Sequence, residues 1–174
     1  MKRYIYKQLL AWKNEKEHKP LILNGARQVG KTYILREFGR NEYKRMAFFS
    51  LDRDQKALEI FNKGGRATDM LMALSAICHE DITPHDTLVV LDEIQNCPKA
   101  LEALKFFCEE TPEIDIVVAG SLLGLSIHSG VSYPVGKVEE LHLYPMTFLE
   151  FLEAMGKTHL GKLLENKIWR VMNM

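Results

Sequence analysis

Residues 24–33 read NGARQVGKTY and follow the short apolar run PLIL at 20–23. The segment from Gly25 to Thr32, GARQVGKT, matches the pattern G-x-x-x-x-G-K-[ST] at every defined position. In such a loop the backbone amides surround phosphate oxygens, and the helix that follows directs its positive end at the same anion. The stretch therefore predicts a site for a nucleoside triphosphate between a buried strand and a helix.

The residue types of this loop have separate expected tasks. Gly25 and Gly30 permit backbone angles that bring amide groups close to phosphate. Lys31 is expected to reach the β- and γ-phosphates, and the Thr32 hydroxyl is expected to ligate Mg²⁺. The predicted nucleotide-binding residues are Gly25, Ala26, Arg27, Gln28, Val29, Gly30, Lys31, Thr32 and Tyr33. For the side chains at 27 and 28 two interpretations stay open, because they can line the mouth of the loop or face solvent.

Two acidic residues follow a second apolar segment, TLVVL at 87–91. Asp92 stands where this predicted strand ends and is expected to hold Mg²⁺ as the partner of Thr32, usually through a water molecule. The adjacent Glu93 is expected to act as the general base that polarises the attacking water. A solvated strand end with an acidic helix cap is the alternative interpretation of this pair. Because the chain also has a complete phosphate loop, the Asp92–Glu93 pair favours a hydrolytic site.

A third strand end carries a polar residue. The segment IVVAGS at 116–121 places Ser121 beside the acidic pair, where it is expected to face the γ-phosphate and to orient water or report hydrolysis. Ser121 can equally cap the helix that follows, and the two roles are compatible.

Hydrophobic periodicity predicts an α/β fold. Strands are expected at 21–23, 46–50, 87–91, 114–119 and 138–143. Helices are expected from residue 4 to 14, at 31–38 up to Gly39, at 54–63, at 68–79, from Pro98 onward, after Thr147 and at 159–172. This alternation predicts a three-layer fold with a central, mostly parallel sheet of about five strands and helices on both faces. The active edge should lie at the carboxyl ends of the strands.

Composition excludes several classes of protein. With 47% hydrophobic and 26% charged residues, the 174-residue chain is typical of a globular protein. Its net charge of zero provides no overall attraction to nucleic acid or anionic lipid. Three cysteines without C-x-x-C spacing and six scattered histidines favour reduced thiols in a cytoplasmic protein without structural zinc. No segment is long and apolar enough for a membrane span.

The N-terminal segment is locally basic. Met1 to Lys7 reads MKRYIYK, and further lysines follow at 13, 16 and 19. These side chains can form a surface that contacts phosphate groups, but a solvated helix face is the preferred interpretation.

Together these motifs resemble the AAA-type P-loop ATPases, and more narrowly a prokaryotic family with GARQVGKT, LDEIQ, GS and a late YP-[ML]-[ST]-F-x-EF segment. That last segment is YPMTFLEF at 144–151 in this chain. The resemblance runs from about residue 3 to the end. It implies ATP and Mg²⁺ as ligands, with Lys31 and Thr32 at the phosphates and the metal, Asp92 at the metal, Glu93 as base and Ser121 as sensor.

The resemblance also sets expectations for domain organisation. Residues 1–145 are expected to form the P-loop ATPase core, and 146–174 a helical tail at the start of a lid or of a linker. Family members usually continue into a C-terminal domain of unestablished function, which the resemblance implies as a partner missing from this chain. A homo-oligomer or another protein partner also agrees with the resemblance, whereas a nucleic-acid partner has no support in the residues.

One departure from the family concerns an arginine. The family often has Gly-Arg before the fifth strand, whereas this sequence has Gly136-Lys137. Lysine supplies a point charge in place of the planar fork of arginine, so Lys137 is expected to be at best a weak substitute for an arginine finger. We therefore expect slow turnover by this chain alone.

Two functions from different classes follow. The first is Mg-dependent ATP binding and hydrolysis coupled to conformational work on a partner. The second is a nucleotide-dependent binding module or switch with little turnover of its own. A small-molecule kinase is disfavoured, because an Asp-Glu pair activates water more naturally than it positions an acceptor. The choice of ATP over GTP rests on the resemblance, since the sequence has no N-K-x-D motif.

Overall fold

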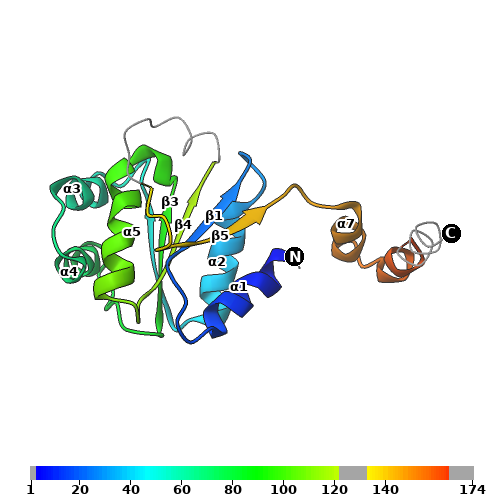
Figure 1. Cartoon of the computed structure of the whole chain (residues 1–174). Helices are drawn as coiled ribbons and strands as arrows, with labels where there is room; N and C mark the ends of the chain where they lie inside the picture. Colours follow the sequence, from blue (N-terminus) through cyan, green and yellow to red (C-terminus); the bar gives the residue numbers. More distant parts are fainter. Residues whose placement is uncertain (1–2, 122–132, 165–174) are drawn as a thin grey trace.

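A central parallel sheet organises the part of the chain that the computed structural model describes, residues 3–121 and 133–164 (Figure 1). The strands are β1 (Leu21–Gly25), β2 (Arg45–Ser50), β3 (Thr87–Asp92), β4 (Asp115–Gly120) and β5 (Glu139–Leu143). Their order is β2-β3-β4-β1-β5, and each neighbouring pair is parallel. The predicted α/β class and the five-stranded sheet are confirmed.

Helices precede, connect and follow the strands, and most of them cover the sheet. They are α1 (Ile5–Asn14), α2 (Lys31–Glu42), α3 (Gln55–Lys63), α4 (Ala67–Cys78), the short 3₁₀ helix η1 (Ile94–Asn96), α5 (Pro98–Glu110) and α7 (Phe148–Ala154). Residues 158–164 are also helical, and the rest of the predicted 159–172 helix lies outside the described residues. In Figure 1, α7 follows β5 on an extended connection and stands beside the N-terminal end of the chain.

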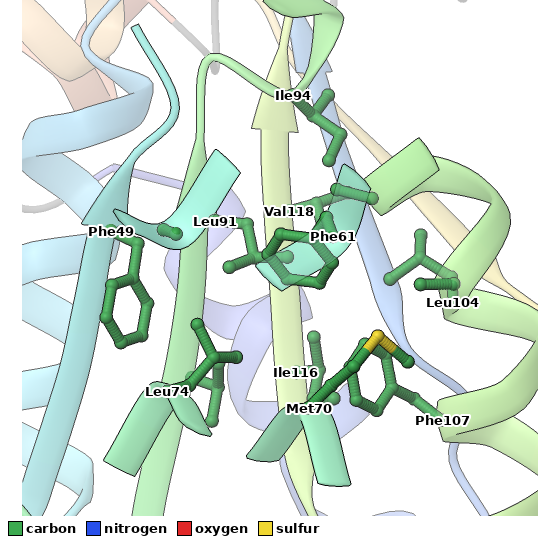
Figure 2. Packing of buried hydrophobic residues seen from close by; sticks show 14 of the residues in the cluster. Phe49, Phe61, Met70, Leu74, Leu91, Ile94, Leu104, Phe107, Ile116 and Val118 are labelled. Atoms are coloured by element: carbon green, nitrogen blue, oxygen red, sulfur yellow. The ribbon is translucent and has the colours of Figure 1, made fainter. Parts of the chain in front are cut away.

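The three central strands, β1, β3 and β4, are buried on both faces, which explains their nearly continuous apolar sequences. Alternate side chains of β1 point in opposite directions: Leu21 and Leu23 pack with α1 and α2, whereas Ile22 packs with α3, α4 and α5. Figure 2 shows the second of these cores, where Phe61 from α3 and Phe107 from α5 meet edge-on with ring centroids 6.5 Å apart. The two cores hold the sheet between two helical layers, as predicted.

One helix continues past its predicted end. The sequence places the stop at Gly39, but α2 runs on to Glu42. A Cβ atom on Gly39 would lie 2.4 Å from Met46 Sδ of β2, so this glycine permits close packing of the helix on the sheet. The prediction is wrong because a glycine required by tertiary packing resembles a helix terminator when only the sequence is considered.

The basic N-terminal segment is not one solvated face. Arg3 is buried, with 7% of its surface exposed, and takes part in an internal network. Lys13 donates to the carbonyl of Glu42 and lies 4.2 Å from the ring centroid of Tyr43. Arg3 therefore fits neither a phosphate-contacting surface nor a solvated helix face, the two interpretations that the sequence allows for this segment.

A buried ion pair at the amino ends of the strands makes the stability depend on pH. His18 Nε2 lies 2.9 Å from Asp115 Oδ1, with both side chains almost inaccessible, and the His18 ring packs on Trp12. The hydrogen bond to Asp115 raises the pKa of His18, against the opposing effect of burial. Protonated His18 therefore stabilises the fold most at a pH below about 6.5, the ordinary pKa of histidine, and this contribution is lost as the pH rises through the folded-state pKa.

We expect the free energy of unfolding to fall between pH 5.5 and pH 8.5 by more in the unaltered chain than in His18→Gln. Urea denaturation at several pH values measures this difference, and the exposed His159 provides the control variant His159→Gln, which should retain the dependence. The same pH dependence in His18→Gln and in the unaltered chain would contradict the assignment.

Candidate nucleotide-binding site

A cleft of about 560 Å³ opens at the carboxyl edge of the sheet, where β1, β3 and β4 end. From β1 the chain continues to β2 on one side, and from β4 it continues to β5 on the other, so the cleft lies where the strand order reverses. Its lining residues are Arg27, Gln28, Gly30, Lys31, Thr32, Tyr33, Asp52, Glu93, Gln95, Asn96 and Ser121. The fold thus brings together the phosphate loop, the acidic pair and the serine that the sequence predicts at three separate strand ends.

The two glycines of the loop are required for different reasons. Gly30 precedes α2 with φ +97°, a left-handed backbone that favours glycine, as predicted. Gly25 is the last residue of β1, and it is not among the residues with positive φ. A Cβ atom there would lie 2.5 Å from the carbonyl oxygen of Leu143, so Gly25 is required by the close approach of β5. The prediction of a special backbone angle at Gly25 is wrong, although a glycine is still needed.

The other loop residues surround the mouth of the cleft. Arg27 and Gln28 are exposed to solvent and also line the cleft, so both interpretations of these side chains, at the mouth of the loop and facing solvent, are correct. Gln28 has φ +64°, a second left-handed position in the loop. Tyr33 is half exposed beside them.

Lys31 is buried at the bottom of the loop. Its Nζ donates to the carbonyl oxygens of Gly25 at 2.9 Å and of Ala26 at 2.8 Å. Burial lowers the pKa of Lys31, and the nearby carboxylates of Glu93 and Asp92 oppose this effect. An ammonium group has three protons, so these two bonds leave capacity for one further acceptor such as a phosphate oxygen.

The Thr32 hydroxyl and the Asp92 carboxylate meet in this cleft region. Thr32 Oγ1 donates to Asp92 Oδ2 at 2.6 Å, and the other oxygen, Oδ1, accepts from the backbone amide of Glu93 at 3.0 Å. A hydroxyl and a carboxylate are the hard oxygen donors that Mg²⁺ prefers, and the site also offers room for the water molecules that this ion retains. These residues therefore fit a magnesium ion.

Glu93 leaves the strand in an unusual conformation. Its backbone is left-handed, with φ +56° and ψ +45°, directly before η1. A non-glycine residue in this region is uncommon and often marks a functional position. The side chain lines the cleft and accepts a hydrogen bond from Gln95 Nε2. The structure thus places a carboxylate beside Lys31 and separately from the Asp92 carboxylate, which binds Thr32.

Ser121 lies directly after β4 and is buried at the cleft wall. β4 lies between β1 and β3 in the sheet, so Ser121 lies between the loop and the acidic pair. Its role as a sensor stays a prediction.

Lys137 does not reach this cleft. It precedes β5, whose first residue, Glu139, pairs with Leu21 at the start of β1 and therefore lies at the opposite edge of the sheet. Its Nζ lies 2.9 Å from Glu109 Oε1 of α5. Lys137 is therefore too far from the chain's own cleft to act there, and its description as at best a weak substitute for an arginine finger stays a prediction.

The structure adds residues that the sequence reasoning missed. Asp52 and Gln95 both line the cleft, Asp52 from the segment after β2 and Gln95 from η1. Arg36 and Arg53 line an adjoining cavity of about 430 Å³ that also includes Thr32 and the acidic pair. Asp52 and Gln95 come within a few residues of a strand end, so the sequence could have identified them as candidates. Nothing in the sequence around Arg36 or Arg53 indicates a position near the cleft.

A further pocket of about 610 Å³ adjoins the loop on the side of β5. It shares Gln28, Gly30 and Tyr33 with the cleft and is completed by Arg3, Val29, Ile34, Pro145 and Met146. The two hollows therefore adjoin one another at the loop.

Other classes of site have no support in the described part of the chain. Across residues 3–121 and 133–164, no group of three His, Cys, Asp or Glu side chains is arranged to hold a metal ion. The cysteines at 78, 97 and 108 are free thiols. Over the same ranges, no helix combines the length and the apolar composition that a membrane span needs.

Comparison with known proteins identifies the family. A family model described as an AAA domain matches residues 17–152. None of the curated proteins matches the sequence significantly.

Solved structures with the same fold include three proteins of low sequence identity. The Walker-type ATPase of Pyrococcus abyssi has a TM-score of 0.53 and 19% identity over 88% of this chain and 57% of its own. Cdc6p of Pyrobaculum aerophilum has a TM-score of 0.54 and 17% identity over 94% of this chain and 51% of its own. Drosophila ORC bound to DNA has a TM-score of 0.52 and 17% identity over 92% of this chain and 47% of its own. The chain thus spans about half the length of each of these proteins.

Proposed function

The chain belongs to the AAA-domain family of P-loop ATPases, and on that premise we propose that it binds Mg·ATP in the cleft and cleaves the bond between the β- and γ-phosphates with water. The observation that carries this proposal is the 2.6 Å hydrogen bond from Thr32 Oγ1 to Asp92 Oδ2. It brings together the end of the phosphate loop and the end of β3, which are 60 positions apart in the sequence. A loop that only bound phosphate would not require this carboxylate.

The proposal assigns separate tasks to the residues of the cleft. Thr32 and Asp92 would hold Mg²⁺, which when bound neutralises charge on the β- and γ-phosphate oxygens. Lys31 donates to the same phosphates, and its buried ammonium is worth more there than in water. Glu93 accepts a proton from the attacking water, and Ser121 hydrogen-bonds to the water or to the γ-phosphate.

The pocket beside the loop is assigned to the nucleoside. Its volume of about 610 Å³ and the lining residues that it shares with the cleft, Gln28, Gly30 and Tyr33, support this placement. Adenine as the base rests on the family, whereas a cytoplasmic location is proposed from the three free cysteines.

The proposal also includes coupling to a partner. We assign residues 1–145 to the ATPase core and 146–174 to a helical tail that transmits the nucleotide state. A C-terminal domain, a second copy of the chain or another protein would receive it. The net charge of zero supports no nucleic-acid partner.

The test is binding and hydrolysis of ATP by the full chain, with Mg²⁺ and with EDTA in its place. We expect binding at least about tenfold tighter with Mg²⁺, which is about 1.4 kcal/mol. Thr32→Ala should lose most of this dependence, because the hydroxyl is one of the two metal donors. Thr87→Ala would perturb the core, so the exposed Thr68→Ala is the matched control.

The outcomes of this assay separate the alternatives. Binding with turnover supports the ATPase, and binding without turnover supports a nucleotide-dependent switch. Stronger binding of GTP than of ATP would contradict the assignment of adenine and indicate guanine as the base. A folded chain that binds neither nucleotide would overturn the proposal.

A further inference from the structure

A buried arginine at the edge of the proposed nucleoside pocket joins the phosphate loop to α7. Arg3 precedes α1, and its side chain is 6% exposed. Its Nε donates to Glu150 Oε1 at 3.1 Å, its Nη1 to the carbonyl of Val29 at 3.3 Å, and its Nη2 to the carbonyl of Tyr144 at 2.7 Å. One guanidinium thus contacts α7, the loop and the exit of β5. We call this set, Arg3 with Glu150 and the carbonyls of Val29 and Tyr144, the Arg3 junction.

The carboxylate of Glu150 is held on both oxygens. Oε1 also accepts from the Tyr4 amide at 2.8 Å, while Oε2 accepts from the Thr147 amide at 2.9 Å. Thr147 Oγ1 accepts in return from the Glu150 amide, which completes a capping box at the start of α7. Burial alone would raise the pKa of Glu150, but the hydrogen bonds from Thr147, Tyr4 and Arg3 hold it below its usual value. Glu150 is therefore the ionised partner that fixes both α7 and Arg3.

The contact to Val29 acts on the geometry of the loop. The carbonyl of Val29 and the amide of Gly30 belong to one planar, trans peptide unit, so they point in opposite directions. Because Arg3 holds the carbonyl, the Gly30 N–H is directed away from Arg3. Gly30 lines the cleft, and amides at this position are the ones that contact phosphate in such loops. Gly30 has no Cβ atom and a left-handed backbone, so this position tolerates a rotation of the peptide that another residue type would resist.

We propose that Arg3 is a positioning residue that orients the Val29–Gly30 peptide for phosphate binding and, through Glu150, couples nucleotide occupancy of the loop to the placement of α7. Arg3 lines the pocket assigned to the nucleoside, but its Nε, Nη1 and Nη2 donate to Glu150, Val29 and Tyr144, so Arg3 acts on the phosphate site through Val29 and does not contact the phosphates. This inference rests on the proposed nucleotide site. Since such coupling is reciprocal, a nucleotide that favours the oriented loop must also stabilise the contacts of α7.

The first test compares Mg·ADP affinity among variants of the full chain. We expect Arg3→Gln to bind at least about tenfold more weakly. Arg3→Lys should be intermediate, because lysine keeps the charge but lacks the planar fork that reaches three acceptors. Arg66→Gln is the matched control: Arg66 also pairs with a carboxylate, Asp69, but on the exposed surface. It should bind within about twofold of the unaltered chain.

The second test detects the coupling itself, and its first part needs no substitution. Amide hydrogen exchange of the unaltered chain is measured with and without Mg·ADP. We expect nucleotide to slow exchange at the amides of Tyr4 and Thr147, which lie outside both hollows, as well as in the loop. In Arg3→Lys the slowing at Tyr4 and Thr147 should shrink while the slowing in the loop remains. This experiment decides the question even if Arg3→Gln does not fold.

The results separate this inference from the proposed function. If the unaltered chain binds Mg·ADP through Lys31 but Arg3→Gln and Arg3→Lys bind equally well, Arg3 only attaches α7 and the inference is overturned alone. Unchanged exchange at Tyr4 and Thr147 on nucleotide binding would also overturn it. A folded chain that binds no nucleotide would overturn both.

Discussion

Replacing Lys31 by alanine is expected to weaken Mg·ATP binding roughly 100-fold or more, which is about 2.7 kcal/mol and within the contribution of one or two charge-assisted hydrogen bonds. The Lys31 ammonium lies at the bottom of the loop and is held by the carbonyls of Gly25 and Ala26. Alanine removes the positive charge from a buried position, where its interaction with phosphate is weakly screened. Titration of a fluorescent ATP analogue or calorimetry measures the loss.

The fold should survive this substitution. Burial lowers the pKa of Lys31, so the charged side chain is less favourable in the folded chain than in the unfolded one. We expect a melting temperature within about 3 °C of that of the unaltered chain, which corresponds to about 1 kcal/mol for a chain of this size. Lys44→Ala is the control, because Lys44 is exposed and pairs with Asp86 away from the cleft. Nucleotide affinity that is the same in Lys31→Ala and Lys44→Ala would contradict the phosphate site.

Replacing Glu93 by glutamine is expected to reduce ATP turnover roughly 100-fold or more, the usual contribution of a general base. Affinity for ATP should change by less than about threefold, because glutamine keeps the shape of the side chain and Glu93 is not a proposed phosphate or metal ligand. The amide can also retain a hydrogen bond with Gln95. Single-turnover hydrolysis together with binding separates the two effects.

Glu113→Gln is the matched control, since Glu113 is exposed in the turn before β4, at the other edge of the sheet. If Glu93→Gln and Glu113→Gln hydrolyse ATP at the same rate, the proposed catalytic role of Glu93 is contradicted. Loss of binding in place of turnover would indicate that Glu93 acts on the nucleotide or the metal.

Much of the candidate site could be predicted because its signals are local. GARQVGKT, the acidic pair after TLVVL and the serine after IVVAG each follow an apolar strand at short range. Parallel strands end at one edge, so three local patterns imply one site. The capping box of α7 is equally local, since Thr147 and Glu150 are three residues apart.

The remaining features depend on contacts between distant segments. Gly39 appears as a helix end, but its neighbour Met46 lies on another element. Gly25 is required by Leu143, and Lys137 is separated from the cleft by the length of the sheet. A sequence pattern gives the spacing of residues along one element, but it does not indicate which elements pack beside one another.

The sequence by itself determined the α/β class, the phosphate loop and the acidic residues, because periodicity and motif spacing act within a few residues. The tertiary structure alone decided the strand order β2-β3-β4-β1-β5, the meeting of Thr32 with Asp92 and the burial of Arg3. Arg3 shows the difference most clearly: in the sequence it belongs to a basic, apparently solvated segment, and in the fold it lies against Glu150, 147 positions away. A buried charge is stable only with such a partner, and only the packing of the chain brings that partner to it.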